Sequence, residues 1–161
     1  MAVQTSYSTD HAALYKGQIV DGQLLNSVSR LNKSGATIPY GQGVVSDGKG
    51  AATLPGDAST AAQFNGVVMR ETNRAYADGD TFGAPDERDM TVVTLGVIAV
   101  ELLDTVTLDS PVYLRVGATG RGDFSGIVGT GVTLGVLVPN AKFKSAGGAG
   151  DLVELSLTVG G

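Results

Sequence analysis

One stretch of this chain, residues 92–100 (VVTLGVIAV), limits what the rest of it can fold into. Nearly every side chain in the stretch is apolar or a threonine, at odd and even positions alike. A strand with one face in water alternates apolar and polar residues instead. The stretch therefore predicts a central strand with protein on both faces. Either a second subunit covers one face, or a loop of the same chain does.

Further strand-like segments recur along the chain and are separated by glycine-rich turns. No long helical pattern lies between them, which argues against a parallel sheet with crossover helices. With 24 glycines in 161 residues, this regular spacing predicts an all-β fold, a single small jelly-roll-like sandwich or barrel. Besides 92–100, the predicted strands are residues 38–45, 64–70, 112–116, 130–138 and 151–159.

The first 38 residues differ from the rest, because they are polar and show no sustained alternation. We expect residues 1–38 to form an extended N-terminal arm and residues 39–161 to form the β-sandwich or barrel body. Some apolar side chains of the arm fall at helical spacing, so a short helix over residues 22–32 is the competing interpretation. Glycines and β-branched residues favour the extended arm. The apolar residues with which the arm could dock are Leu24, Leu25, Val28 and Leu31.

Composition removes several classes of function. The chain has no cysteine and its only histidine is His11, so it has neither a thiolate nucleophile nor a histidine-rich metal site. The net charge of −5 and the scattered basic residues argue against binding to nucleic acid. No apolar stretch is long enough to span a bilayer, and the first 14 residues do not show the basic segment followed by an apolar run that a secretory signal needs. We therefore predict a protein that is not an enzyme, carries no cofactor or metal, and acts without a membrane or nucleic acid.

Three short motifs invite a functional interpretation. Residues 71–89 form a charged loop whose carboxylates could hold calcium, but the ligand spacing of an EF-hand is absent, which favours a solvated acidic loop. Residues 121–123 spell Arg-Gly-Asp, the tripeptide of some adhesion ligands, in a turn-rich segment. Residues 32–34 have the form of a glycosylation sequon. The acidic residues of the loop are Asp78, Asp80, Asp86, Glu87 and Asp89.

Several segments taken together resemble the small capsid cement, or decoration, proteins of tailed bacteriophages. Each motif is mainly glycine plus β-branched residues, so their shared order and spacing carry the resemblance, which extends over most of the chain, the arm included. The loop at residues 71–89 departs from the pattern. The segments are IPYGQGVV (38–45), FNGVVMR (64–70), TLGVI (94–98), DSPVYLR (109–115) and SAGGAGDLVELSL (145–157).

The resemblance implies an all-β homo-oligomer, dimer or trimer, made in the host cytoplasm and bound to the outer surface of the icosahedral head. Its partner there would be the major capsid protein, whose subunit contacts it would stabilise, and the family has no catalytic residues to transfer. The central stretch and the arm then supply the candidate interface, which consists of Val93, Leu95, Val97, Ile98, Leu24, Leu25, Val28 and Leu31.

A host-facing receptor- or carbohydrate-binding β-sandwich is the alternative function. Sugars usually stack on exposed aromatic side chains, and this chain has no tryptophan and only 6% aromatic residues. That composition argues against the carbohydrate-binding alternative.

Overall fold

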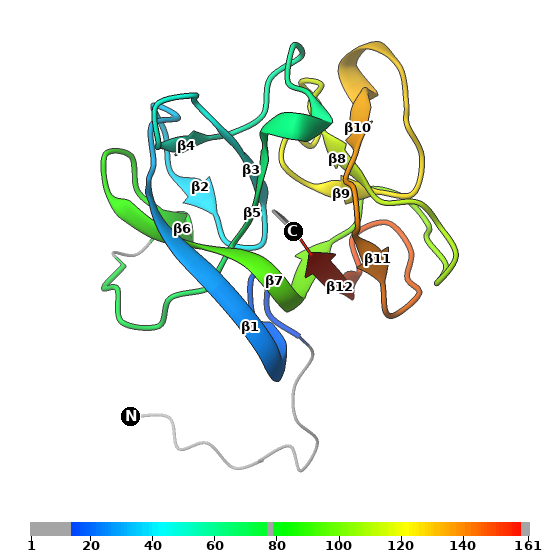
Figure 1. Cartoon of the computed structure of the whole chain (residues 1–161), viewed down its shortest axis with the longest axis horizontal. Coiled ribbons are helices and arrows are strands. Elements are labelled where there is room, and N and C mark those ends of the chain that lie inside the picture. Colours follow the sequence, from blue (N-terminus) through cyan, green and yellow to red (C-terminus); the bar gives the residue numbers. More distant parts are fainter. Residues whose placement is uncertain (1–13, 77–78, 159–161) are drawn as a thin grey trace.

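The structure, a computed structural model, describes residues 14–76 and 79–158 (Figure 1). Within these residues the regular elements are strands and two one-turn 3-10 helices, η1 (Ala61–Gln63) and η2 (Gly131–Thr133). The strands are β1 (Ile19–Leu31), β2 (Ile38–Pro39), β3 (Gly43–Ser46), β4 (Ala52–Thr53), β5 (Phe64–Val68), β6 (Gly83–Ala84), β7 (Asp89–Glu101), β8 (Tyr113–Arg115), β9 (Phe124–Ser125), β10 (Gly135–Leu137), β11 (Lys142–Phe143) and β12 (Leu152–Thr158).

The strands form three sheets in which every named pair is antiparallel. The large sheet has the order β11-β12-β7-β5-β3-β4, with β1 added beside β7; the others are β10-β8-β9 and β2-β6. The prediction of an all-β fold is therefore confirmed. The described strands do not join into a closed barrel. No helix of the described part of the chain has the length and hydropathy needed to cross a membrane.

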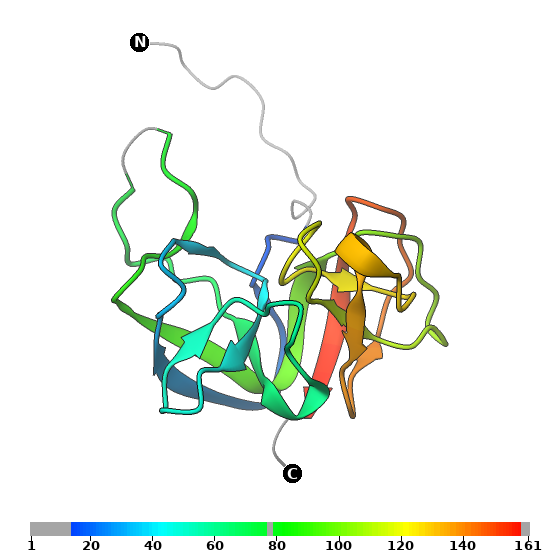
Figure 2. The same ribbon diagram turned by 90° about the horizontal axis from the view of Figure 1, so that it is seen from above.

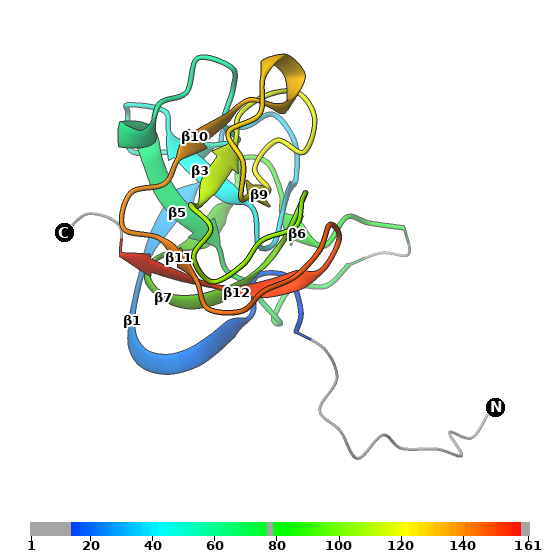
Figure 3. The same cartoon turned by 90° about the vertical axis from the view of Figure 1, so that its right-hand side faces the viewer.

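Strand β7 pairs with three other strands. β1 lies along residues 89–98, β5 pairs at Val92 and Val93, and β12 pairs over residues 95–101. A strand residue offers hydrogen-bonding groups to two sides only. Since β1 occupies one edge of β7 throughout, β5 and β12 share the opposite edge. Figure 3 shows β1 curving along the outside of β7.

The two faces of β7 contribute to two different apolar clusters. Val93 packs among residues of β5, β8, β9 and β12, whereas Val92 packs among residues of β2, β3 and β6. In Figure 2 the yellow and orange strands of the β10-β8-β9 sheet and the red strand β12 lie towards one end of the molecule, and β2 and β6 lie towards the other. At Val92 and Val93 the chain itself therefore covers both faces, which explains why apolar residues occupy odd and even positions there.

Strand β5 crosses β7 with almost no space between the two backbones. Gly66 has a φ of +132°, and a Cβ atom at this position would lie 2.2 Å from the carbonyl oxygen of Val93. Only glycine combines this backbone conformation with such a close approach. The pairing of β5 with β3 also shifts register beside Gly66, because Val44 pairs with Gly66 and Val45 pairs with Phe64.

The structure decides one open alternative and corrects one strand boundary. The helical alternative for residues 22–32 fails because β1 pairs along β7, and that tertiary pairing overrides the helical spacing of the leucines. The predicted strand at 130–138 begins only at Gly135, because residues 131–133 form a 3-10 turn closed by the Thr133 and Thr130 backbones. Val132 is consequently 62% exposed instead of facing the core.

The division into an arm of residues 1–38 and a body of residues 39–161 stays a prediction. Residues 1–13, which include His11, lie outside the described residues. Within residues 19–31, none of the described side chains is fully buried, although Ile19 and Val28 pack against the two clusters. Much of β1 thus runs along the outside of the sheet and contributes little to the interior.

Replacing Gly66 by alanine tests the close approach of β5 to β7. We expect the free energy of unfolding to fall by about 1–3 kcal/mol from the backbone conformation alone, with a further loss from the contact with Val93. Gly56→Ala is the matched control, because Gly56 has open space around its Cβ position and no positive φ. Urea denaturation measures both, and equal stability of the two variants would contradict the prediction.

Candidate interaction surface

Strand β1 carries a large bulge opposite the middle of β7. Asp21 pairs with Val97 and Asn26 pairs with Leu95, so residues 22–25 stand opposite Gly96 alone. Within the bulge Leu24 has a φ of +39° and a side chain that is 83% exposed. A left-handed backbone costs a leucine about 1–2 kcal/mol. A strained, solvent-exposed leucine is the kind of feature that gathers at functional sites.

Gly96 allows the bulge to lie close to β7. Its φ is +136°, and a Cβ atom at this position would lie 3.0 Å from Cδ1 of Leu25. A larger residue would therefore push Leu25 away from the sheet. Beside it, Leu24, Leu95 and Val97 line a hollow of about 170 Å³, together with polar side chains that include Ser156 and Thr158 of β12.

We call Leu24, Leu25, Leu95, Gly96 and Val97 the bulge surface. Leu24 and Leu25 are exposed, and the three β7 residues are partly exposed. Apolar side chains grouped in this way with a polar rim are typical of a surface that another protein covers. The arrangement brings together four of the residues that the sequence had nominated for an interface.

The other nominated residues lie elsewhere. Val93 and Ile98 are fully buried in the core of the same chain, while Val28 and Leu31 are partly buried farther along β1. Val93 and Ile98 belong to one cluster although their positions differ by five, an odd number, so the alternation of β7 slips once between them. The slip falls at the Gly96 irregularity and leaves Leu95 and Val97 partly exposed.

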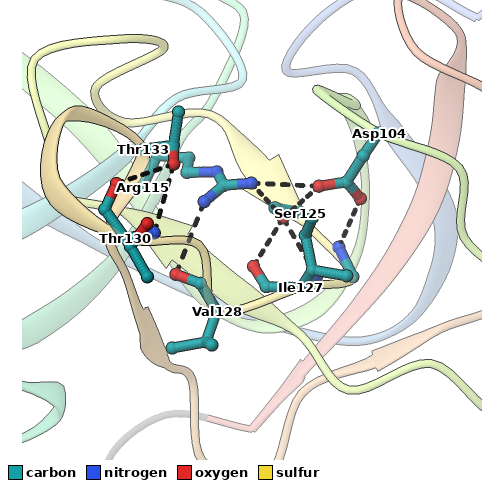
Figure 4. Close-up of polar contacts among 8 residues, drawn as sticks. Asp104, Arg115, Ser125, Ile127, Val128, Thr130 and Thr133 are labelled. Carbon is teal, nitrogen blue, oxygen red and sulfur yellow. Dashed lines mark hydrogen bonds and ion pairs between the residues drawn. The ribbon is translucent and has the colours of Figure 1, made fainter.

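A buried charged network lies away from the bulge surface, and the sequence analysis did not predict it (Figure 4). Arg115 is only 3% exposed. Its Nη2 atom donates to Asp104 Oδ2 at 3.0 Å and to Ser125 Oγ at 2.8 Å. Alternation along residues 112–116 places Arg115 on the face opposite Leu114 and gives no sign that this face is buried. Its burial depends on Asp104 and Ser125, which come from separate segments and give no local signal.

This network is structural in its chemistry. The Ser125 hydroxyl contacts Asp104, but Ser125 has no exposed surface and no histidine lies in the described part of the chain to act as its base. The same hydroxyl lies 2.8 Å from the carbonyl oxygen of Ile127, and Asp104 Oδ1 accepts a hydrogen bond from the Gly126 amide at 2.7 Å. The network therefore holds the loop that follows β9.

The Arg-Gly-Asp tripeptide is engaged within its own chain. Arg121 Nη2 lies 3.0 Å from Asp57 Oδ1, and the Asp123 carboxylate accepts a hydrogen bond from Gln42 Nε2 at 3.2 Å. Burial raises the pKa of Asp123, although the hydrogen bond from Gln42 opposes the shift. Both side chains that an adhesion receptor would read are thus already paired with other residues of the same chain.

The remaining motifs also have structural explanations. Asn32, the first residue of the sequon, is fully buried, and its side-chain amide donates to the carbonyl oxygens of Ala36 and Ala84. In the acidic loop, Asp86 accepts from the Gly35 amide and Glu87 pairs with Lys33. The described residues contain no group of three or more side chains able to hold a metal ion; Asp78 lies outside them.

These features define a class of protein. It is an all-β protein that presents an exposed apolar surface, and its buried polar groups hold loops in place and do no chemistry. The family model described as structural cement protein (E217 gp24/Pam3 gp6) matches residues 3–158, and the chain belongs to this phage cement family. The family is a structural one, which confirms the resemblance and the prediction that the chain is not an enzyme.

The fold itself is shared with a solved virion component. A chain of "The capsid of Myoviridae Phage XM1" matches with a TM-score of 0.69 at 17% identity, covering 98% of each chain. A search of curated proteins found no match. The predicted place of the protein in the phage capsid is confirmed by the family.

Replacing Asp123 by asparagine tests the buried carboxyl. Because its pKa is raised in the folded protein, Asp123 makes its most favourable contribution below the unfolded pKa of about 4, and stability is lost as the pH rises through the folded pKa. We therefore expect Asp123→Asn to be more stable than the wild type at neutral pH, with the difference shrinking towards pH 4. Thermal unfolding across the pH range measures this.

The control is Asp57→Asn, at an exposed ion pair worth less than about 1 kcal/mol. If the difference in stability between Asp123→Asn and the wild type does not change with pH, the raised pKa of Asp123 is wrong.

Proposed function

We propose that the protein binds the outer surface of the phage head and stabilises contacts between neighbouring major capsid subunits. The observation that carries this proposal is membership of the cement family over residues 3–158. An exposed apolar bulge on a β-rich body supports it, because such a body can dock on a protein shell without any chemical step. We describe the body as a jelly-roll-like sandwich, since the β10-β8-β9 sheet shares one apolar cluster with the large sheet.

Binding across the seam between two subunits would stabilise the shell through occupancy. A molecule that touches two subunits makes its second contact at a high effective concentration. Free energy gained only on the assembled shell adds to the stability of that shell by mass action. The net charge of −5 disfavours contact with packaged DNA, so the outer face of the shell is the proposed partner.

We further propose that the protein is a homodimer or homotrimer that uses the bulge surface for its subunit contact. Leu24 is the anchor of this surface, because its side chain is 83% exposed and stands on a strained backbone. The arm of residues 1–38, which includes β1, would place this contact beside the sheet, and the body of residues 39–161 would carry the rest of the structure. Val28 and Leu31 extend the same strand away from the bulge.

Leu24→Asp tests the subunit contact. We expect the dissociation constant of the homo-oligomer to rise at least tenfold in this variant, which corresponds to about 1.4 kcal/mol. The reason is that the aspartate charge would have to be buried in an apolar contact. Sedimentation velocity over a range of concentrations measures it. Leu108→Asp is the control, since Leu108 is also an exposed leucine, at 50%, but lies outside the bulge surface. A wild-type protein that stays monomeric at high concentration and on its shell would exclude the homo-oligomer.

The effect on the shell is tested with particles that lack the protein. We expect such heads to assemble and expand, yet to release DNA at a lower temperature. Each bound copy needs only about 8–12 kcal/mol, the equivalent of micromolar to nanomolar affinity. Adding purified protein back should restore resistance with a midpoint that depends on its concentration. Identical thermal DNA-release curves for depleted and replenished heads would refute the proposed function.

A host-facing binding module remains the second candidate, and one observation favours it. A pocket of about 550 Å³ is lined by Tyr15, Tyr40 and Phe82 beside Arg70. The Arg70 guanidinium lies 4.4 Å from the centre of the Tyr15 ring. Aromatic rings next to a charged group could stack on a sugar. A glycan array probed with the purified protein separates this function from binding to the shell.

A further inference from the structure

A second apolar surface lies on the loop and strand that follow β9. Its side chains are about half exposed or more: Ile127 at 58%, Val128 at 50%, Val132 at 62% and Leu137 at 50%. We call these four residues the loop surface. The whole segment from Phe124 to Ala141 contains no charged residue. Large aliphatic side chains are therefore presented to water with no charge among them, which is typical of a surface that another protein covers.

The backbone beneath the loop surface is tied down by hydrogen bonds. Arg115 Nη1 donates to the carbonyl oxygen of Val128 at 3.4 Å, and the Gly135 amide donates to the same oxygen at 2.6 Å. The Ile127 amide donates to Ser125 Oγ at 3.1 Å. The Thr119 amide donates to the carbonyl oxygen of Val132 at 2.9 Å. The aliphatic side chains thus stand on a loop whose conformation is set before any partner arrives.

The buried Arg115–Asp104 ion pair beneath the loop surface supports a role for this loop in binding. Burying an ion pair such as Arg115–Asp104 usually contributes little net stability, since desolvation offsets the attraction. The pair does contact the loop, because Figure 4 shows Arg115 hydrogen-bonded to the Val128 carbonyl oxygen and Ser125 hydrogen-bonded to Ile127. Ordering a binding loop during folding lowers the entropy lost when it binds.

Strand β10 adds a backbone edge to the loop surface, and the loop covers this edge at the Gly135 amide, which donates to the Val128 carbonyl oxygen. It is the end strand of the β10-β8-β9 sheet, and residues 135–137 carry neither charge nor proline. Natural proteins normally protect such edges with charged side chains, prolines or a covering segment. Here the edge lies beside exposed Leu137, so one partner could cover both.

We infer that the loop surface is a docking face for an uncharged, apolar surface of the major capsid protein; this inference rests on the proposed function. The charge pattern selects the partner, because phosphate-bearing ligands need lysine or arginine and the segment has neither. Bridging also requires two separate faces. β10 lies on the opposite side of the molecule from β1 (Figure 1), so the loop surface and the bulge surface can be occupied at once.

The inference is tested by placing a charge on the loop surface. In Ile127→Asp and Val132→Asp the new carboxylate replaces a mostly exposed side chain, so the fold is retained. Binding is measured by co-sedimentation of the full-length protein with expanded heads of its own phage that lack it, over a range of concentrations. We expect both variants to bind at least tenfold more weakly than wild type and to keep the wild-type oligomeric state. Ala62→Asp, at an exposed apolar residue of η1 that belongs to none of the proposed binding surfaces, should bind normally.

Each other outcome overturns the inference in a recognisable way. If both variants bind like the wild type, the loop surface is not the docking face, while the proposed function stands. If they lose self-association but still bind the heads, the loop surface contacts a second copy. If the wild type itself does not bind the heads, the proposed function fails together with the inference.

Arg115→Lys tests whether the loop order matters. Lysine keeps the positive charge but loses the planar fork that reaches Asp104, Ser125 and Val128 together. We expect faster hydrogen exchange at the Gly135 amide, unchanged exchange at core amides of β12, and weaker binding to heads although Ile127 and Val132 are intact. Faster exchange with unchanged affinity would show that the ordering plays no part in docking.

Discussion

The structure depends on β7, because other strands pair with both of its edges and apolar clusters pack against both of its faces. One edge carries β1, the other carries β5 and then β12, and the faces meet two different apolar clusters. A single strand thereby connects most of the molecule, so an irregularity in it affects several neighbours at once. The irregularity at Gly96 shifts the alternation of β7 and makes room for the bulge of β1.

Two surfaces on the molecule leave aliphatic side chains in water, and each has a structural cost beneath it. Leu24 stands on a left-handed backbone, and the loop after β9 stands on a buried ion pair. Both features support the proposed use of these two surfaces in binding.

The motifs that resemble chemical or recognition sites have structural roles in this protein. Arg121 and Asp123 pair with other residues of the chain, Asn32 is buried, and Ser125 supports a loop. These contacts satisfy hydrogen-bonding groups that folding removes from water, although Nε of Arg121 is buried without a partner. Polar residues of this protein therefore hold its shape, and its exposed apolar residues are the ones available for interaction.

The sequence by itself determined the class of fold and the class of function. Apolar residues at both parities of 92–100, the regular turns, the absence of cysteine and the single histidine sufficed to predict an all-β protein that is not an enzyme. These properties depend on neighbouring residues or on composition, so they can be read locally. The strand at residues 151–159 was recognised for the same reason, since Val153, Leu155 and Leu157 alternate towards the core.

Only the tertiary structure decided which side chains face outward. Val93 and Ile98 became core while Leu95 and Val97 stayed near the surface, because the slip at Gly96 depends on residues 22–25 of a distant strand. Arg115 turned inward because Asp104 and Ser125 come together only after folding. Alternation is a property of one strand, whereas the direction of a side chain depends on which distant partner satisfies it.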